Sequence, residues 1–184
     1  MRWMNLRHLA ACAMVAALAA CAGGQGGSKP EPARVATTSL PAPDMSAVDQ
    51  PLAAEVTRLV NAARAERGRD PLGYAADLAR VAAIHSADMV ARGFTGHYNP
   101  DGQGAKERVI AVRGERAGSI GENIAVVTRE EGESRESVAA RVVQQWQESP
   151  RHRQLMMASY FDQTGVGVAI SGNEIYVTEL FAGE

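Results

Sequence analysis

Cysteine is scarce in this chain: the 184 residues contain two, Cys12 and Cys21. Both lie in an N-terminal stretch that we interpret below as an export signal, so the folded part is expected to contain no free thiol. This excludes a disulfide framework and a cysteine nucleophile. The fold must then be stabilised by an ordinary apolar core, and the remaining chain is long enough for one such domain.

Lysine is also rare, and positive charge is not concentrated anywhere. Lys29 and Lys106 are the two lysines, and the formal net charge is -2 at pH 7. The sequence contains no basic stripe with interleaved aromatic residues, which is the usual signature of a nucleic-acid-binding surface. We therefore expect no nucleic-acid partner.

The sequence has no apolar run long enough to span a bilayer. Its longest, residues 9–20, is too short for a transmembrane helix and follows the positive residues Arg2 and Arg7. Residues 18–21 resemble a bacterial lipobox, which predicts that residues 1–21 are a lipoprotein signal peptide and that Cys21 is lipidated. The same letters at residues 9–12 lie too close to Arg7 to leave room for a signal core. The alternative is a plain secretory signal cut at an Ala-x-Ala site.

Large apolar side chains are few between residues 22 and 48, where Gly, Pro, Ala, Ser and Thr dominate. Such a segment cannot bury enough surface to fold, so we predict a disordered tether. The folded domain is then expected over residues 49–184. Together these features predict an exported, membrane-anchored lipoprotein that faces the periplasm or the cell surface.

Within the expected domain, the spacing of apolar residues changes from helical to strand-like along the chain. Residues 166, 168 and 170 are large and alternate with the small Gly165, Gly167 and Ala169. This predicts a strand with one small face that a helix can approach closely, paired as a hairpin with residues 175–181. Helices first and a hairpin last indicate an α+β domain with an antiparallel sheet. Four segments before it have helical spacing: residues 51–67, 75–92, 105–113 and 137–148.

Three ionisable residues lie in separate segments, each beside glycine or proline: His97, Glu122 and His152. Two imidazoles and one carboxylate can bind a divalent metal or transfer protons. Spacing alone does not show that these side chains meet. His85 differs, because it lies on the apolar face of the helix predicted over residues 75–92, and we interpret it as a core histidine.

Five blocks in order resemble the CAP superfamily, also called the SCP domain, which is named after cysteine-rich secretory proteins, antigen 5 and pathogenesis-related 1 proteins. The similarity is closest to the bacterial branch without disulfides. The Gly-Glu-Asn-Ile-Ala run is the most specific block. The blocks are residues 59–64, residues 83–97, residues 121–125, Trp146 with residues 149–153, and residues 165–168.

This resemblance implies a three-layer α-β-α sandwich with a central antiparallel sheet and a cleft that binds Zn²⁺ or another divalent cation. By matching motif, His97, Glu122 and His152 occupy the cleft and are the implied metal ligands. Ser149 stands where the family has an acidic residue, and Arg151 places a positive charge beside His152, so we expect weak metal binding.

Further residues are expected to support the cleft. Asn123 is interpreted as fixing the loop that holds Glu122. Tyr98 and Ser149 are expected in the second shell around the cleft.

The function that we expect is an extracytoplasmic binding module whose cleft holds a divalent metal and a small apolar or peptide-like ligand. Relatives suggest lipid, peptide or cell-wall ligands. A Zn-dependent hydrolase using His97, Glu122 and His152 is the main alternative. Serine hydrolysis through Ser149 is a weaker one, because no Gly-x-Ser-x-Gly elbow is present.

Overall fold

The structure, a computed structural model, describes residues 39–114 and 117–184. The described residues belong to one compact unit. The predicted signal peptide, the lipidation site Cys21 and most of the predicted tether lie outside the described residues. No helix in the described part combines the length and the apolar character needed to cross a membrane.

The first two helices follow the predicted pattern closely. Helix α1 spans Gln50–Ala65, and its N-cap Asp49 accepts a hydrogen bond from the Leu52 N–H at 3.1 Å. Its buried stripe includes Val56 and Val60. Helix α2 spans Ala76–Arg92 and ends at Gly93, which adopts a left-handed conformation with φ of 64°.

Three shorter helices follow: α3 at Ala105–Arg113, α4 at Arg135–Glu148 and α5 at Pro150–Met156. The bounds of α3 match the prediction. Helix α4 begins two residues earlier than expected, because the Ser134 hydroxyl accepts from the Ser137 N–H and caps the helix. Ser149 ends α4 and begins α5, where Pro150 fits the first helical turn.

The sheet has four strands in the order β1-β3-β4-β2. Strands β3 (Gln163–Ser171) and β4 (Glu174–Gly183) form the predicted hairpin. Strand β2 (Ser119–Thr128) pairs antiparallel with β4 along its whole length. The two-residue β1 (Gly73–Tyr74) pairs parallel with β3, so the sheet is mixed and not purely antiparallel as predicted.

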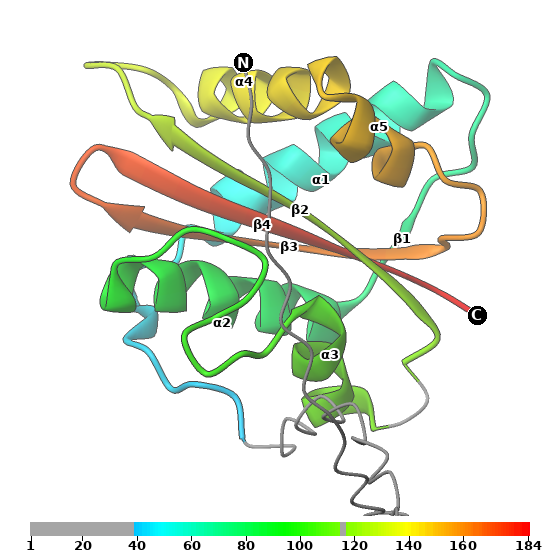
Figure 1. The fold of residues 1–184 in the computed structure, drawn as a ribbon. Coiled ribbons are helices and arrows are strands. Elements are labelled where there is room, and N and C mark those ends of the chain that lie inside the picture. Colours follow the sequence, from blue (N-terminus) through cyan, green and yellow to red (C-terminus); the bar gives the residue numbers. More distant parts are fainter. Residues whose placement is uncertain (1–38, 115–116) are drawn as a thin grey trace, which may run out of the picture. The chain divides into compact units, whose positions relative to one another are not determined.

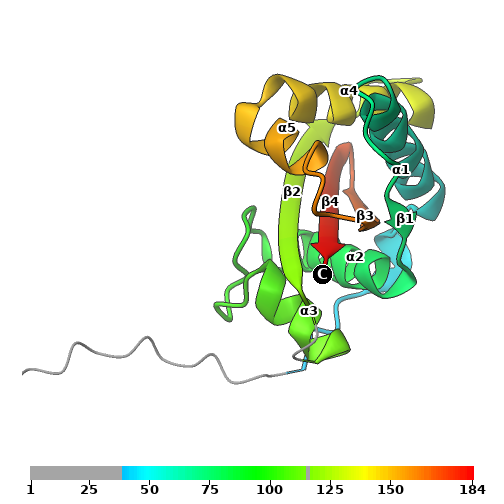
Figure 2. The ribbon, with the colours of Figure 1, turned by 90° about the vertical axis from the view of Figure 1, so that its right-hand side faces the viewer.

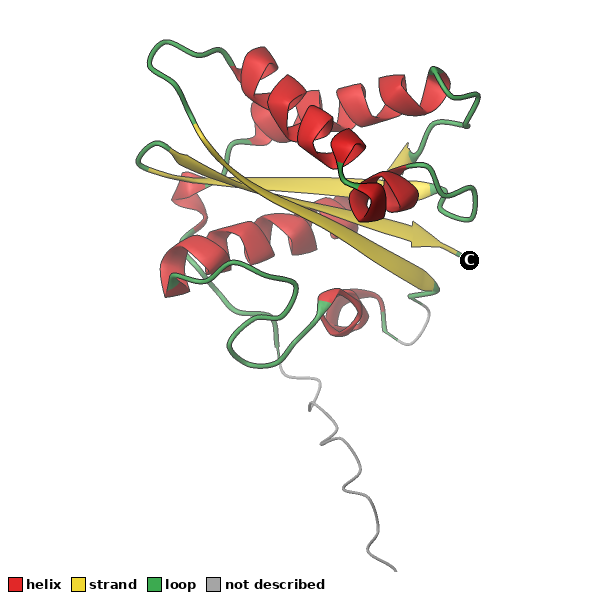
Figure 3. Cartoon of the chain, turned by 45° about the horizontal axis from the view of Figure 1, so that its top comes forward, coloured by secondary structure: helices red, strands yellow, loops and turns green. Residues whose placement is uncertain are grey.

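The expected three layers are present. Helices α1, α4 and α5 cover one face of the sheet, and α2 and α3 cover the other (Figures 1 and 3). The predicted small face of β3 lies against α2. A Cβ added to Gly167 would lie 2.0 Å from the Ala83 backbone nitrogen, so only glycine allows the helix to approach this closely. The α+β sandwich is therefore confirmed. The glycines of β3 explain why α2 packs so closely against the sheet.

Residues 39–48, which we assigned to the tether, contact the domain. Met45–Ala47 forms a single 3₁₀ turn, and Val48 makes a β-bridge with Ala169. The Asp49 N–H donates to the Val168 carbonyl at 3.1 Å, and Leu40 packs against the apolar cluster under α2. Residues before 49 therefore contribute contacts to the domain, because apolar side chains such as Leu40 pack against it.

Candidate functional site

Strand β2 is an edge strand, at the opposite end of the sheet from β1. Sequence analysis placed Glu122 in a loop, but Glu122 and Asn123 lie within this strand. Because successive side chains of a strand point to opposite faces, Glu122 faces α2 and α3, whereas Asn123 faces the layer of α1, α4 and α5. Figure 2 shows β2 at this edge, with α5 on one side and α3 on the other.

Glu122 is the centre of a charged cluster on the α3 side. Its side chain is buried, and one oxygen, Oε1, lies 2.8 Å from Nδ1 of His97. The second oxygen, Oε2, accepts a hydrogen bond from the Arg108 guanidinium. Arg108 is itself 1% exposed and also donates to the carbonyls of His97 and Gln103, at 3.0 and 2.8 Å. The buried negative charge is therefore compensated by a buried positive one.

This arrangement fixes the orientation of the His97 ring. A carboxylate that already pairs with a guanidinium accepts hydrogen bonds, so Nδ1 of His97 is the donor of the pair. In the neutral form of the ring, the other nitrogen, Nε2, carries the lone pair. The His97 side chain is 54% exposed, so that nitrogen belongs to an accessible imidazole. Carboxylate-oriented imidazoles of this kind are common metal ligands.

His152 approaches the same edge of the sheet from α5. Burial lowers the pKa of the His152 imidazole, and the nearby charges of His97 and Arg151 lower it further. The Nδ1 atom of His152 is buried and has no hydrogen-bond partner among the described residues. The two histidines therefore interact electrostatically, although the segments that carry them belong to layers on opposite faces of the sheet.

The three predicted ligands do not form a three-ligand metal site in this structure. Residues 39–114 and 117–184 contain no group of three or more His, Cys, Asp or Glu side chains placed to hold a metal ion. The physical reason lies in Glu122, because His97 and Arg108 already use its two oxygens. Two imidazoles, those of His97 and His152, keep a nitrogen for a ligand.

The three predicted second-shell residues have different environments. The Asn123 side-chain amide donates to the carbonyl of His152 at 3.2 Å, so it links β2 to α5. Tyr98 is 70% exposed, and its ring lies over Gly104. The Ser149 carbonyl accepts from the Arg153 N–H, but the described residues offer no hydrogen bond to its hydroxyl.

Sequence reasoning missed the role of Arg108. Arg108 lies within the helix predicted over residues 105–113, and a charged residue that falls on the buried face of a helix is itself a signal of a buried ion pair. His85 is buried as predicted, and its Nε2 lies 2.9 Å from the Gly96 carbonyl. Burial and the nearby Arg108 charge lower the pKa of His85 to about 4, so the ring is neutral and donates to that carbonyl.

A hollow of about 570 Å³ lies at the beginning of β2. Ile120, which lines it, shares a face of β2 with Glu122, and Lys106 lines it from the first turn of α3. The exposed Tyr160 and the half-buried Leu155 form its other side. The hollow therefore lies further along the same strand as Glu122, and polar atoms contribute more of its lining than apolar ones.

The comparisons with known proteins agree with this architecture. A family model described as "CAP: Cysteine-rich secretory protein family" matches residues 57–181. Curated proteins give no significant match. Among solved structures, an extracellular protein with an SCP domain from Bacillus anthracis is similar with a TM-score of 0.59 and 25% identity. The alignment covers 74% of this chain and 41% of that protein, so this chain spans less than half of its length.

Two more distant structures share the fold. An outer surface protein from Borrelia burgdorferi has a TM-score of 0.62 and 17% identity, over 73% of this chain and 94% of that one. A structure of NaASP2 with Zn²⁺ has a TM-score of 0.54 and 13% identity, over 77% of this chain and 83% of that one. At these identities the similarity shows a common fold alone.

Proposed function

This chain belongs to the CAP family of cysteine-rich secretory proteins, and on that basis we propose that it is an exported binding module, anchored to a membrane through Cys21. Its binding site is the cluster of His97, Glu122 and His152 at the edge of β2. The module faces the periplasm or the cell surface and binds no nucleic acid.

The observation that carries this proposal is the state of Glu122. The carboxylate is buried between His97 and Arg108, and both of its oxygens accept hydrogen bonds. A carboxylate held in this way orients an accessible imidazole, but it is not free to remove a proton from a water molecule. The same feature argues against the hydrolase alternative, in which Glu122 would act as a general base.

The ligand that fits this edge best is peptide-like. An edge strand offers unpaired backbone groups to an extended chain, and Ile120 and Leu155 in the hollow beside it offer apolar contacts for a side chain. Lys106 provides a positive charge for a carboxylate of the ligand. Lipid and cell-wall fragments are the other ligand classes that the family resemblance suggests.

A divalent cation such as Zn²⁺ fits the site as a weakly bound addition. The chemistry of the donors supports this: His97 is oriented by Glu122, and His152 has a buried ring nitrogen without a partner among the described residues. These two imidazoles would hold the ion, and Glu122 would act from the second shell. The positive charges of Arg108 and Arg151 oppose the ion, so the affinity is low.

Titration calorimetry with ZnCl₂ tests this site. The protein should carry Cys12→Ser and Cys21→Ser, so that no thiol competes for the ion. We expect one weak site at pH 7.5 that His97→Ala or His152→Ala abolishes, and that Glu122→Gln weakens by about 10- to 100-fold. Binding should weaken below about pH 6, where imidazoles become protonated.

His85→Gln is the matched control, because His85 is a buried histidine whose Nε2 bonds to a backbone carbonyl. It should leave Zn²⁺ binding unchanged. If both His97→Ala and His152→Ala bind Zn²⁺ as the parent does, the proposed site is wrong.

Mass spectrometry of the mature protein tests the anchor separately. We expect an N-terminal peptide that begins at Cys21 and carries acyl chains, since two or three chains hold a protein on a membrane stably. An unmodified N-terminus beyond residue 21 would show a secreted protein instead, without bearing on the site at β2.

A further inference from the structure

Strand β3 has a gap in the hydrogen bonding along its outer edge. The carbonyls of Thr164 and Val168 face this edge, where they accept from the Ala75 N–H at 2.9 Å and from the Asp49 N–H at 3.1 Å. Val166 lies between them, and every second residue of a strand directs its N–H and C=O to the same side. The Val166 N–H and C=O therefore also face the edge, but no group of the described residues bonds to them there.

This unpaired step of the sheet is buried, yet a ligand can reach it. Val166 is 4% exposed, and buried backbone groups are almost always paired with protein, with an ordered water molecule or with a ligand. A hollow of about 470 Å³ opens at this point, and Val166 lines it together with residues of α1 and α2. The sheet order β1-β3-β4-β2 separates this gap from the His97 site at β2.

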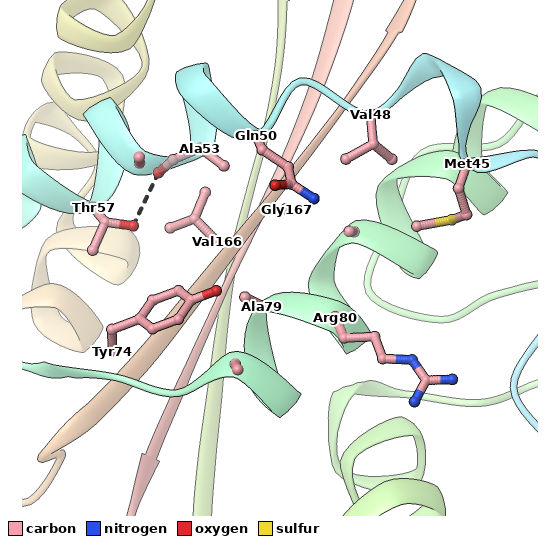
Figure 4. Close-up of a pocket in the computed structure, with 13 residues that line it drawn as sticks. Met45, Val48, Gln50, Ala53, Thr57, Tyr74, Ala79, Arg80, Val166 and Gly167 are labelled. Atoms are coloured by element: carbon pink, nitrogen blue, oxygen red, sulfur yellow. Dashed lines mark hydrogen bonds between the residues drawn. The ribbon is translucent and has the colours of Figure 1, made fainter.

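The space around the gap has small apolar walls and no charge directed into it. Ala53 on α1 and Ala79 on α2 form walls beside Val166, and Figure 4 shows the Tyr74 hydroxyl and the Gln50 amide directed toward the middle of the hollow. Within the described ranges, these two side chains take part in no hydrogen bond. The Arg80 side chain extends away from the hollow (Figure 4), and no lining residue is acidic. The groups that a ligand meets here are therefore uncharged.

We infer that this gap binds one residue of an extended, uncharged peptide, whose N–H donates to the Val166 carbonyl and whose C=O accepts from the Val166 N–H. An extended residue carries both groups on one side, so it matches Val166 as in an antiparallel pair. Strand β1 and the bridge at Val48 already pair with β3 on either side of the gap, so the peptide continues an existing edge by β-augmentation. An acyl chain has no donor for the Val166 carbonyl and would leave the gap open.

An NMR titration of the isotope-labelled full chain carrying Cys12→Ser and Cys21→Ser tests this inference. The probe is N-acetyl-leucine methylamide, and its matched comparison is the ester analogue in which oxygen replaces the leucine N–H. We expect the amide probe to shift the Val166 amide signal in a saturable way. The ester analogue should bind roughly three- to tenfold more weakly, as expected for the loss of one hydrogen bond. If neither probe moves the Val166 signal up to its solubility limit, the gap holds water only and the inference is wrong.

Variants locate the binding. Ala79→Leu fills the space beside Val166 and should abolish the shift; Ala54→Leu, at an exposed lining position, serves the same purpose if the first variant is unstable. Ala65→Leu, at an exposed position of α1 outside the hollow, should change nothing. His97→Ala should also leave the titration unchanged, and a loss of binding in that variant would place the peptide at β2 instead. The inference also fails if the ester analogue binds as tightly as the amide, or if both filling variants bind as the parent does.

Discussion

Asn123 on β2 lies directly across from Glu179 on β4, and both side chains are fully buried on the same face of the sheet. The Asn123 amide nitrogen donates to the His152 carbonyl, so its oxygen points elsewhere and has no partner among the described residues. The Oε2 atom of Glu179 also has none. Burial raises the pKa of Glu179 to about 8, so the group is a neutral acid at neutral pH.

Glu179→Gln should therefore stabilise the protein at alkaline pH. The folded state holds the Glu179 proton up to about pH 8, whereas the unfolded chain releases it near the ordinary glutamate pKa of 4.5. Stability contributed by this group is complete below about pH 4.5 and is lost as the pH rises to about 8. The amide of Gln keeps a donor without that loss. Chemical denaturation between pH 4 and 9 should show a gain of up to about 4 kcal/mol at pH 8.5 and little change at pH 4.5.

Glu174→Gln provides the comparison, since Glu174 is an exposed residue at the start of the same strand. It should leave the pH dependence of the unfolding free energy as it is. If Glu179→Gln destabilises the protein equally at every pH, Glu179 is ionised in the core and its charge is balanced there, with Arg64 as the nearest candidate.

His85 should produce the opposite pH dependence on the acid side. Its pKa is lowered to about 4 by burial and by Arg108, whereas a histidine in the unfolded chain titrates near 6.5. Between these values the unfolded state binds the extra proton, so the unfolding free energy falls as the pH falls from 6.5 to 4. His85→Gln keeps a donor for the Gly96 carbonyl, and denaturation curves over this range should become flatter. An unchanged slope would mean that other groups dominate acid unfolding.

The sequence predicted most of the fold because most of the fold follows local patterns. Helical spacing located α1 to α4, and the alternation of glycine with valine on β3 predicted both the strand and the close approach of α2. Strand β2 was not predicted, because its first half contains Gly121, Glu122 and Asn123, which are poor strand formers. It becomes a strand through its pairing with β4, and that pairing is visible only in three dimensions.

The candidate site was predicted only in part, because contacts between distant segments are likewise visible only in three dimensions. Motif position identified His97 and Glu122, and the structure joins them with one hydrogen bond. The motif did not indicate that Arg108 would occupy the other oxygen of Glu122, because the two residues come from separate elements. An arginine on the buried face of a helix was the available signal, but the helical pattern does not show that its partner is Glu122.

Removal of residues 39–48 should destabilise the domain, whereas removal of the preceding residues should not. The segment contributes the β-bridge of Val48 with Ala169 and the packing of Leu40. A chain that begins at Ser39 should have the same unfolding midpoint as the full mature protein. A chain that begins at Asp49 should lose about 1–3 kcal/mol, or roughly 3–10 °C in the midpoint by differential scanning calorimetry. Equal midpoints for the two chains would place the tether boundary at residue 48, as the composition alone suggested.

Arg108→Met should be far more damaging than the loss of a surface ion pair, and it should also change the site. It leaves the buried Glu122 carboxylate without its guanidinium, which costs about 3–5 kcal/mol. Arg58→Met, at an exposed pair with Glu55, should have little effect on stability, because water and salt screen such pairs. Adding Glu122→Gln to Arg108→Met should recover part of the loss in a double-mutant cycle, because no uncompensated charge remains. Arg108→Met alone should tighten Zn²⁺ binding in calorimetry, since a positive charge is removed and Glu122 Oε2 no longer pairs with a guanidinium; unchanged affinity would show that Arg108 does not limit the metal site.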